Sequence, residues 1–132
     1  MAGASSADKR PLSPHLQVWR WHVTMAGSIL HRVTGVGLYG GAALLALWLW
    51  AASEGPSAYA PFGQLLATWY GQAALYLLVA ALAYHLANGI RHLVLDVGLG
   101  MKPADADMSA WLVILFAAAA PLGLWLLVEF GR

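Results

Sequence analysis

The sequence predicts an all-α membrane protein with three transmembrane helices. The chain has 132 residues, of which 61% are hydrophobic and 10% charged, whereas an average soluble protein has roughly 25% charged residues. Three apolar runs reach the length of about 20 residues that a helix needs to cross a bilayer. Length and composition therefore indicate a single domain of the membrane class.

The three predicted spans are joined by short linkers and cover about 28–52, 64–95 and 109–130. The first span has no charged residue between Val33 and Ser53, and the third has none before Glu129. The linkers, SEGPSAYAPFG and VGLGMKPADADM, are rich in Gly, Pro or Asp and are expected to be loops. Ser109 is expected to cap the third helix, and Pro121 is expected to kink it.

Positive charges predict the orientation of these helices. Lys and Arg residues precede or open the first span or lie around the second linker, whereas the first linker has none: Lys9, Arg10, Arg20, Arg32, Arg91 and Lys102. The positive-inside rule then places the N-terminus and the second linker in the cytoplasm and the C-terminus in the periplasm. Residues 1–27 are expected to form a cytoplasmic segment and residues 28–132 the transmembrane domain.

The composition also excludes several kinds of site. The chain contains no cysteine, so it cannot form disulfides, thiolate-bound iron–sulfur clusters or a CxxCH haem attachment. Its net charge is +1, and no basic patch alternates with aromatics, which argues against nucleic-acid binding. A haem held by histidine alone is still allowed.

A polar stripe marks the end of the second span, in HLANGIRHLVLD at 85–96. At roughly 100° per residue, His85, Asn88, Gly89, His92 and Asp96 share one helix face, whereas Arg91 points away from it. His85 is the deepest of these residues in the membrane. Such a stripe can serve packing alone, because histidine can form hydrogen bonds between membrane helices.

The functional interpretation of His85 is an axial ligand of a b-type haem, whose iron binds neutral imidazole. Gly89, one turn further on, leaves room for the edge of the macrocycle. Two histidines on one helical stripe cannot face each other across one iron, so the second ligand must come from His31 or from another polypeptide. The haem propionates need cations or hydrogen-bond donors, for which the candidates are Arg32, Arg91 and His92.

A second group of polar residues opens the first span, in SILHRVTGVGL at 28–38. Ser28 and Arg32 share a helix face, and His31 lies beside them. A hydroxyl, an imidazole and a guanidinium next to an apolar wall suit a quinone, whose carbonyls need donors and whose reduction needs protons. Taken singly, Arg32 is equally typical of a positive-inside anchor, and Ser28 of a cap or a backbone-bonding serine.

These motifs resemble those of the cytochrome b subunits, the large membrane anchors, of succinate dehydrogenase (respiratory complex II). Three stretches carry the resemblance: RPLSPHLQVWRW at 10–21, SILHRVTGVGL at 28–38 and HLANGIRHLVLDVG at 85–98. The match extends from about residue 9 through the third span. Trp19 stands where the family usually has tyrosine, and Gly27 stands where a larger apolar residue is common.

The resemblance implies a membrane-anchor cytochrome b subunit of succinate:ubiquinone oxidoreductase. Such a subunit pairs with a second small anchor and binds the flavoprotein and iron–sulfur subunits, which carry FAD and the iron–sulfur clusters. His85 would be one axial ligand of haem b, and the partner anchor would supply the other. Ser28 and Arg32 would help to form the ubiquinone site, and His31 would lie beside it, near a haem propionate.

The same resemblance implies that residues 1–27 pack on the iron–sulfur subunit and that the complex lies in a bacterial inner membrane. Succinate oxidation itself would occur on the flavoprotein subunit, so no catalytic residue is expected in this chain. Two alternatives remain open. The chain could be a haem-free anchor that binds quinone, or the anchor of a quinol:fumarate reductase of similar design.

Overall fold

The computed structural model describes residues 20–131. This part of the chain forms four helices, α1 (Val23–Glu54), α2 (Pro56–Ala67), α3 (Trp69–Asp96) and α4 (Pro103–Phe130). Helices α1, α3 and α4 are each long and apolar enough to cross a membrane. The predicted all-α fold with three spanning helices is therefore confirmed. Lys9, Arg10, Trp19 and most of the segment 1–27 lie outside the described residues.

The first linker is a helix rather than the predicted loop. Pro56 occupies the first turn of α2, and Pro61 lies inside that helix. Proline is tolerated at the first helical position because the amide that it lacks would have no partner there. Gly55, with a φ of 105°, separates α1 from α2. Proline was expected to break a helix throughout this stretch, whereas Pro56 helps to start one.

The third span begins earlier than predicted. Helix α4 starts at Pro103, and its N-cap residue is Lys102 rather than Ser109. Asp105 in the first turn is placed where a negative charge interacts favourably with the helix dipole. Ser109 instead lies inside the helix, where its hydroxyl donates to the carbonyl of Ala106 at 3.0 Å.

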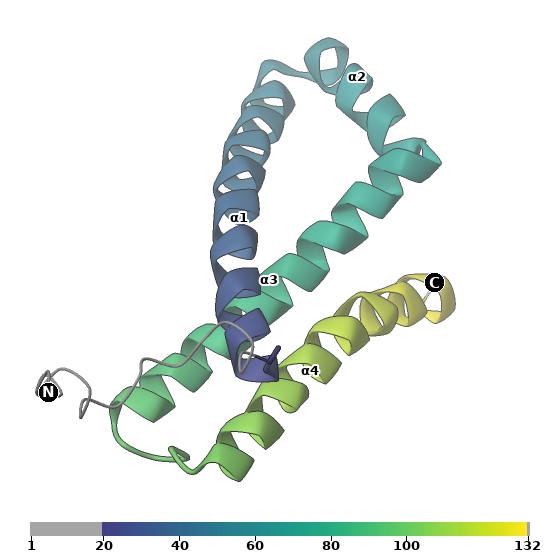
Figure 1. Cartoon of the computed structure of the whole chain (residues 1–132). Helices are drawn as coiled ribbons and strands as arrows, with labels where there is room; N and C mark the ends of the chain where they lie inside the picture. Colours follow the sequence, from purple (N-terminus) through teal and green to yellow (C-terminus); the bar gives the residue numbers. More distant parts are fainter. Residues whose placement is uncertain (1–19, 132) are drawn as a thin grey trace, which may run out of the picture.

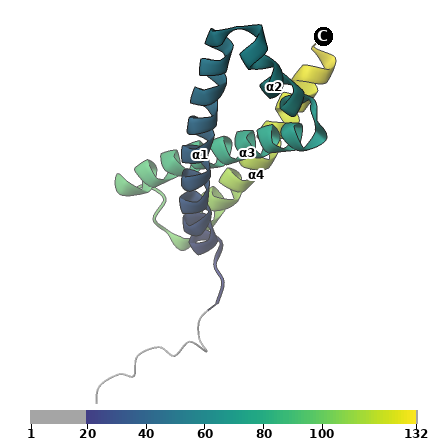
Figure 2. The same cartoon turned by 90° about the horizontal axis from the view of Figure 1, so that it is seen from above.

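The spanning helices cross near one end of the molecule. In Figure 1, α1 crosses α3 in the lower part of the view, the two helices diverge upward, and α2 joins their upper ends. The view from above in Figure 2 shows the same crossing, with α4 running close to α3. The start of α1, the end of α3 and the start of α4 therefore lie at the same end of the molecule, as the motif order predicts for the first two.

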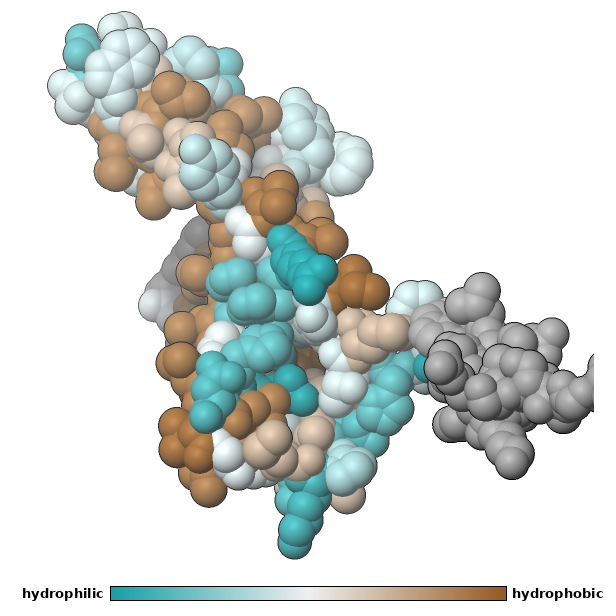
Figure 3. Space-filling view, turned by 60° about the vertical axis from the view of Figure 1, so that its left-hand side comes forward, coloured by the Kyte–Doolittle hydropathy of each residue, from teal (hydrophilic) through white to brown (hydrophobic). Residues whose placement is uncertain are grey.

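The buried core is small and lies where α3 meets α1 and α4. Tyr84 is 6% exposed and packs with Val113 and Ala117 of α4, while its hydroxyl donates to the carbonyl of Gly27 on α1 at 2.7 Å. Most large apolar side chains are exposed. In Figure 3, hydrophilic residues gather in the middle and lower part of the face, with hydrophobic residues around them. This surface suits a chain surrounded by lipid and partner helices.

Gly71 holds the tight corner between α2 and α3, and we expect Gly71→Ala to disrupt it. An added Cβ would meet the carbonyl oxygen of Leu65 and would lie 3.0 Å from the Cα of Leu66. These are backbone atoms, so the corner itself must open, and the cap in which Thr68 Oγ1 accepts from the Gly71 amide at 3.1 Å would be disturbed. We expect a loss of about 3 kcal/mol, measured as a lower midpoint of thermal unfolding of the purified complex.

Gly63→Ala is the matched control for this prediction. Gly63 also lies in α2, but there an added Cβ would be 3.6 Å from Cε1 of Tyr59, an ordinary contact. Alanine favours a helix over glycine by roughly 1 kcal/mol, so the control should leave the midpoint unchanged or raise it. Equal midpoints for the two variants would show that the corner at Gly71 is not constrained.

Candidate functional site

The imidazole of His85 is fixed by two contacts with α1. Its Nδ1 atom lies 3.2 Å from the backbone carbonyl of His31 and 3.2 Å from the hydroxyl of Thr34. A carbonyl oxygen can only accept a hydrogen bond, so Nδ1 of His85 carries the proton. The Thr34 hydroxyl is also 2.8 Å from the Leu30 carbonyl, to which it donates, and it is thus free to accept from His85. In a neutral imidazole with this tautomer, the Nε2 atom of His85 keeps its lone pair.

Because Gly35 has no side chain, the ring of His85 can lie against α1. A Cβ at this position would lie 3.1 Å from Cε1 of His85 and 3.7 Å from its Nδ1. The first of these distances is shorter than ordinary carbon–carbon contacts, which lie at about 3.5–4.0 Å. A side chain at residue 35 would therefore push the imidazole away from the carbonyl and the hydroxyl that orient it.

Three histidines from the two helices come together around His31. Its ring stacks on that of His85, with the centroids 3.9 Å apart and the planes 8° apart. The centroid of the His92 ring lies 5.4 Å from that of His31, and the two ring planes are tilted by 60°. Gly89, which was predicted to leave room for a macrocycle, lies under His31, whose Cε1 would be 3.9 Å from an added Cβ.

The stacking of His31 on His85 restricts which residue can be the second iron ligand. Two axial imidazoles point their nitrogens at each other across the iron, whereas these two rings lie face to face. In this arrangement the two residues cannot bind one iron from opposite sides. The Nδ1 atom of His31 is buried and has no hydrogen-bond partner among the described residues, so a polar contact is still available there.

Ser28 and Arg32 lie on the first turns of α1, before and after His31. Ser28 is half-buried, and the side chain of Arg32 is exposed. Gly27, which departs from the family pattern, is buried, and a Cβ there would be 3.4 Å from the hydroxyl of Tyr84. An added Cβ would thus make an ordinary van der Waals contact with the tyrosine, whose hydroxyl bonds to the α1 backbone directly beside Ser28.

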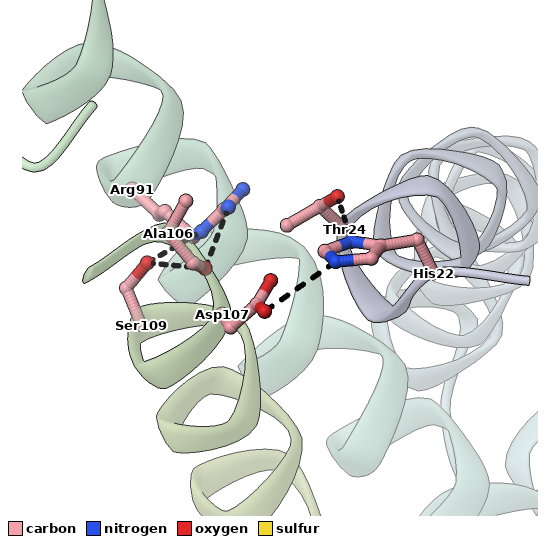
Figure 4. A network of polar contacts seen from close by, with 6 residues as sticks. All are labelled: His22, Thr24, Arg91, Ala106, Asp107 and Ser109. Atoms are coloured by element: carbon pink, nitrogen blue, oxygen red, sulfur yellow. Dashed lines mark hydrogen bonds and ion pairs between the residues drawn. The ribbon is translucent and has the colours of Figure 1, made fainter. Parts of the chain in front are cut away.

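Arg91 points away from the histidines, as the helical periodicity predicts. Its Nε donates to the hydroxyl of Ser109 at 2.9 Å, and its Nη2 donates to the carbonyl of Ala106 at 3.1 Å. Figure 4 shows the guanidinium lying over this first part of α4. Of the predicted rim residues, His31 therefore lies against His85 and His92 lies beside His31, while Arg91 contacts α4.

Thr34 was not among the predicted site residues, and Asn88 was predicted to lie on the polar face of the second span but without a role. Thr34 follows His31 by three residues, which brings both to the side of α1 that faces His85. Asn88 is 2% exposed, and its Nδ2 has no hydrogen-bond partner among the described residues. The sequence alone could have drawn attention to Asn88, because an asparagine is unusual in an apolar helix and buried positions are usually occupied by apolar residues.

A further contact joins the starts of α1 and α4. Nε2 of His22, the N-cap residue of α1, lies 3.4 Å from a carboxylate oxygen of Asp107. Its Nδ1 lies 2.8 Å from the hydroxyl of Thr24, as Figure 4 shows. This contact holds the first turn of α1 next to α4, at the end of the molecule where the histidines lie.

Comparison with known proteins identifies the family of the chain. The family model described as "Succinate dehydrogenase/Fumarate reductase transmembrane subunit" matches residues 6–124. The succinate dehydrogenase cytochrome b556 subunit of Paracoccus denitrificans is 39% identical over 121 residues, which cover 92% of each chain. The chain belongs to the succinate dehydrogenase cytochrome b family. As a member of this family, it is a membrane subunit of the succinate dehydrogenase complex.

Other relatives extend the cytochrome b family match to further organisms. The cytochrome b556 subunit of Rickettsia felis is 35% identical over 118 residues, 89% of this chain and 92% of the relative. The mitochondrial cytochrome b560 subunit of Mus musculus is 35% identical over 124 residues, 91% of this chain and 72% of the relative. The matched range contains every histidine and arginine of the site described above.

Proposed function

We propose that this succinate dehydrogenase subunit binds haem b through Nε2 of His85 and that a second membrane-anchor subunit supplies the opposite ligand. The hydrogen bond from Nδ1 of His85 to the carbonyl of His31 carries this proposal. Histidines that bind metals almost always donate their other ring nitrogen to such an acceptor, which fixes the tautomer and the ring orientation. The face-to-face stacking of His31 supports an external source for the second ligand.

The haem, when bound, supplies one-electron redox chemistry, and the residues of this chain hold and orient it. We propose His31, Arg32 and His92 as donors toward the propionates. The unpartnered Nδ1 of His31 supports this role, because a buried polar atom without a hydrogen bond is costly. Arg91, a further candidate from the sequence, has its own contacts on α4.

We propose that ubiquinone is reduced next to Ser28 and Arg32. The serine hydroxyl and the guanidinium can donate hydrogen bonds to the quinone oxygens, on which negative charge develops during reduction. The half-buried serine and the exposed arginine support a site between this chain and its partners. Electrons would arrive from the iron–sulfur subunit, so the chain would link succinate oxidation to the respiratory chain.

The proposed complex also contains the flavoprotein subunit with FAD and the iron–sulfur subunit, both on the cytoplasmic side. The positive residues at the start of α1 and after α3 support this orientation. The identity to the Paracoccus relative, at 39%, supports placement in a bacterial inner membrane. Residues 1–27 would pack on the iron–sulfur subunit.

Two alternatives remain testable. A quinol:fumarate reductase anchor is favoured by the family description, which names fumarate reductase beside succinate dehydrogenase. A haem-free anchor that binds only quinone would use Ser28 and Arg32 but would leave His85 without an iron. An optical spectrum of the purified complex, and its relative rates of succinate oxidation and fumarate reduction, distinguish these alternatives.

The quinone site is tested with the double variant Ser28→Ala/Arg32→Ala. Removing hydrogen-bond donors from a developing negative charge costs on the order of 100-fold in rate. We therefore expect succinate-dependent ubiquinone reduction to fall by about 100-fold, while succinate oxidation with a soluble artificial acceptor is unchanged.

Ser53→Ala is the control for this double variant. Ser53 lies at the far end of α1, where its hydroxyl donates to the carbonyl of Trp50 at 2.7 Å. This variant should reduce ubiquinone at the normal rate. Normal ubiquinone reduction by the double variant would remove Ser28 and Arg32 from the quinone site.

A further inference from the structure

A cleft between α3 and α4 lies outside the histidine site and has no role in the proposed function. It encloses about 260 Å³ at the end of the molecule where α3 ends and α4 begins. Its walls are mostly apolar, and the side chains of Arg91, Asp105 and Ser109 also line it. An arginine in an apolar cleft of a membrane helix pair requires an explanation, because such residues are costly without a partner for their charge.

The guanidinium of Arg91 is held rigidly but is not neutralised. Its two contacts, with Ser109 and the carbonyl of Ala106, are neutral groups on α4. Across residues 20–131 the one ion pair is that of His22 with Asp107, so Arg91 has no carboxylate within 4.0 Å. Figure 4 shows the third guanidinium nitrogen directed away from both partners. Arg91 can therefore offer a fixed positive charge and free N–H donors to a ligand.

The second charge in the cleft restricts the kind of ligand. Asp105 lines the same cleft and is exposed, so a ligand at Arg91 meets a carboxylate nearby. A ligand with only negative charge would be repelled by that carboxylate. A zwitterion, with a phosphate at Arg91 and an ammonium at Asp105, matches both charges.

We propose that this cleft binds a zwitterionic phospholipid whose headgroup carries a primary ammonium, such as phosphatidylethanolamine. The phosphate of a phospholipid lies where the hydrocarbon of the bilayer begins, which is the depth expected for an arginine one to two turns before the end of a spanning helix. Arginine matches the geometry of phosphate oxygens. The apolar wall, which includes Ala87, Leu112 and Val113, receives part of one acyl chain.

A primary ammonium distinguishes this ligand from other common lipids. Phosphatidylcholine has the same phosphate but no N–H donor for the Asp105 carboxylate, and phosphatidylglycerol has the phosphate but no positive charge. The proposal thus assigns the phosphate contact to Arg91 and the selection among headgroups to Asp105. It does not depend on the haem or the quinone assignment.

The test measures lipid retention by the purified four-subunit complex. The complex is delipidated in detergent and titrated with phosphatidylethanolamine, phosphatidylcholine or phosphatidylglycerol, and bound lipids are counted by native mass spectrometry. We expect wild type to bind phosphatidylethanolamine roughly tenfold more tightly than the other two lipids. Equal retention of all three lipids would overturn the proposal.

Two variants separate the roles of the charges. Arg91→Gln should weaken binding of all three lipids, and Asp105→Asn should abolish the preference for phosphatidylethanolamine and improve binding of phosphatidylglycerol. Lys102→Gln, which removes a positive charge at the N-cap of α4 outside the cleft lining, should change nothing. A preference that persists in Asp105→Asn would refute the ammonium contact.

A third variant covers the case in which Arg91→Gln prevents assembly. Val94 lines the cleft and is 44% exposed, so Val94→Trp fills the cleft from the outside without altering either charge or the core. We expect this variant to assemble and to lose the bound lipid. An assembled Val94→Trp complex that retains phosphatidylethanolamine like wild type would place the lipid elsewhere.

Discussion

The assembled complex that carries His85→Ala is expected to lose its b-type haem spectrum. In the structure, His85 is the histidine whose Nδ1 is committed to a backbone carbonyl, which leaves Nε2 for iron. Removing only the hydrogen-bond partner of a metal-binding histidine costs about 10–100-fold in affinity, so removing the ligand itself should cost at least as much. The measurement is the reduced-minus-oxidised spectrum, with haem per flavin as the readout.

His22→Gln is the matched control for His85→Ala. His22 lies at the same end of the molecule, but its ring contacts Asp107 and Thr24 rather than the histidine cluster. The control should keep a full haem complement. An unchanged spectrum in assembled His85→Ala would refute the ligand assignment, and a wild-type complex without a haem spectrum would favour the haem-free anchor.

Gly35→Val is expected to reduce haem binding although it alters no candidate ligand. The first atom of the new side chain would lie 3.1 Å from Cε1 of His85, and the valine methyl groups extend further. The ring must then leave the His31 carbonyl and the Thr34 hydroxyl. We expect a loss of about 10–100-fold in haem affinity, the usual effect of losing such a hydrogen bond, together with a changed redox potential in the haem that remains.

Gly123→Val in α4 is the control for this second prediction. A Cβ at Gly123 meets no atom within 4 Å, so the same change of residue should leave haem content unaffected. The haem content of each variant is measured per flavin, which corrects for any loss of assembled complex. Full haem binding with an unchanged redox potential in Gly35→Val would mean that haem binding does not depend on the position of the His85 ring against α1.

The spanning helices could be predicted from the sequence because the thickness of the bilayer requires a run of about 20 apolar residues. This requirement does not depend on tertiary contacts. The helix limits were less predictable. Pro56 and Pro103 each begin a helix, because the amide that proline lacks would have no partner in the first turn. The effect of a proline on a helix depends on its position along that helix, and its presence alone did not predict where these helices begin.

The candidate site was predicted in its residue types but not in its contacts. Periodicity along α3 placed His85 and His92 on one face and Arg91 on another, and the structure agrees. It could not place His31 on top of His85, because that contact depends on how α1 crosses α3. For the same reason Thr34 and Gly35 were not recognised, since their importance lies only in what faces them from the other helix.

The small buried core affects the stability of the subunit before it is assembled into the complex. With only a few side chains buried among residues 20–131, this part of the free chain gains little from its own packing, and binding to partner subunits contributes the missing stability by mass action. The free energy of unfolding is then a property of the complex and of partner concentration. In a cell that makes too little of a partner, the unassembled chain would be a ready substrate for membrane proteases, so its abundance would follow that of the complex.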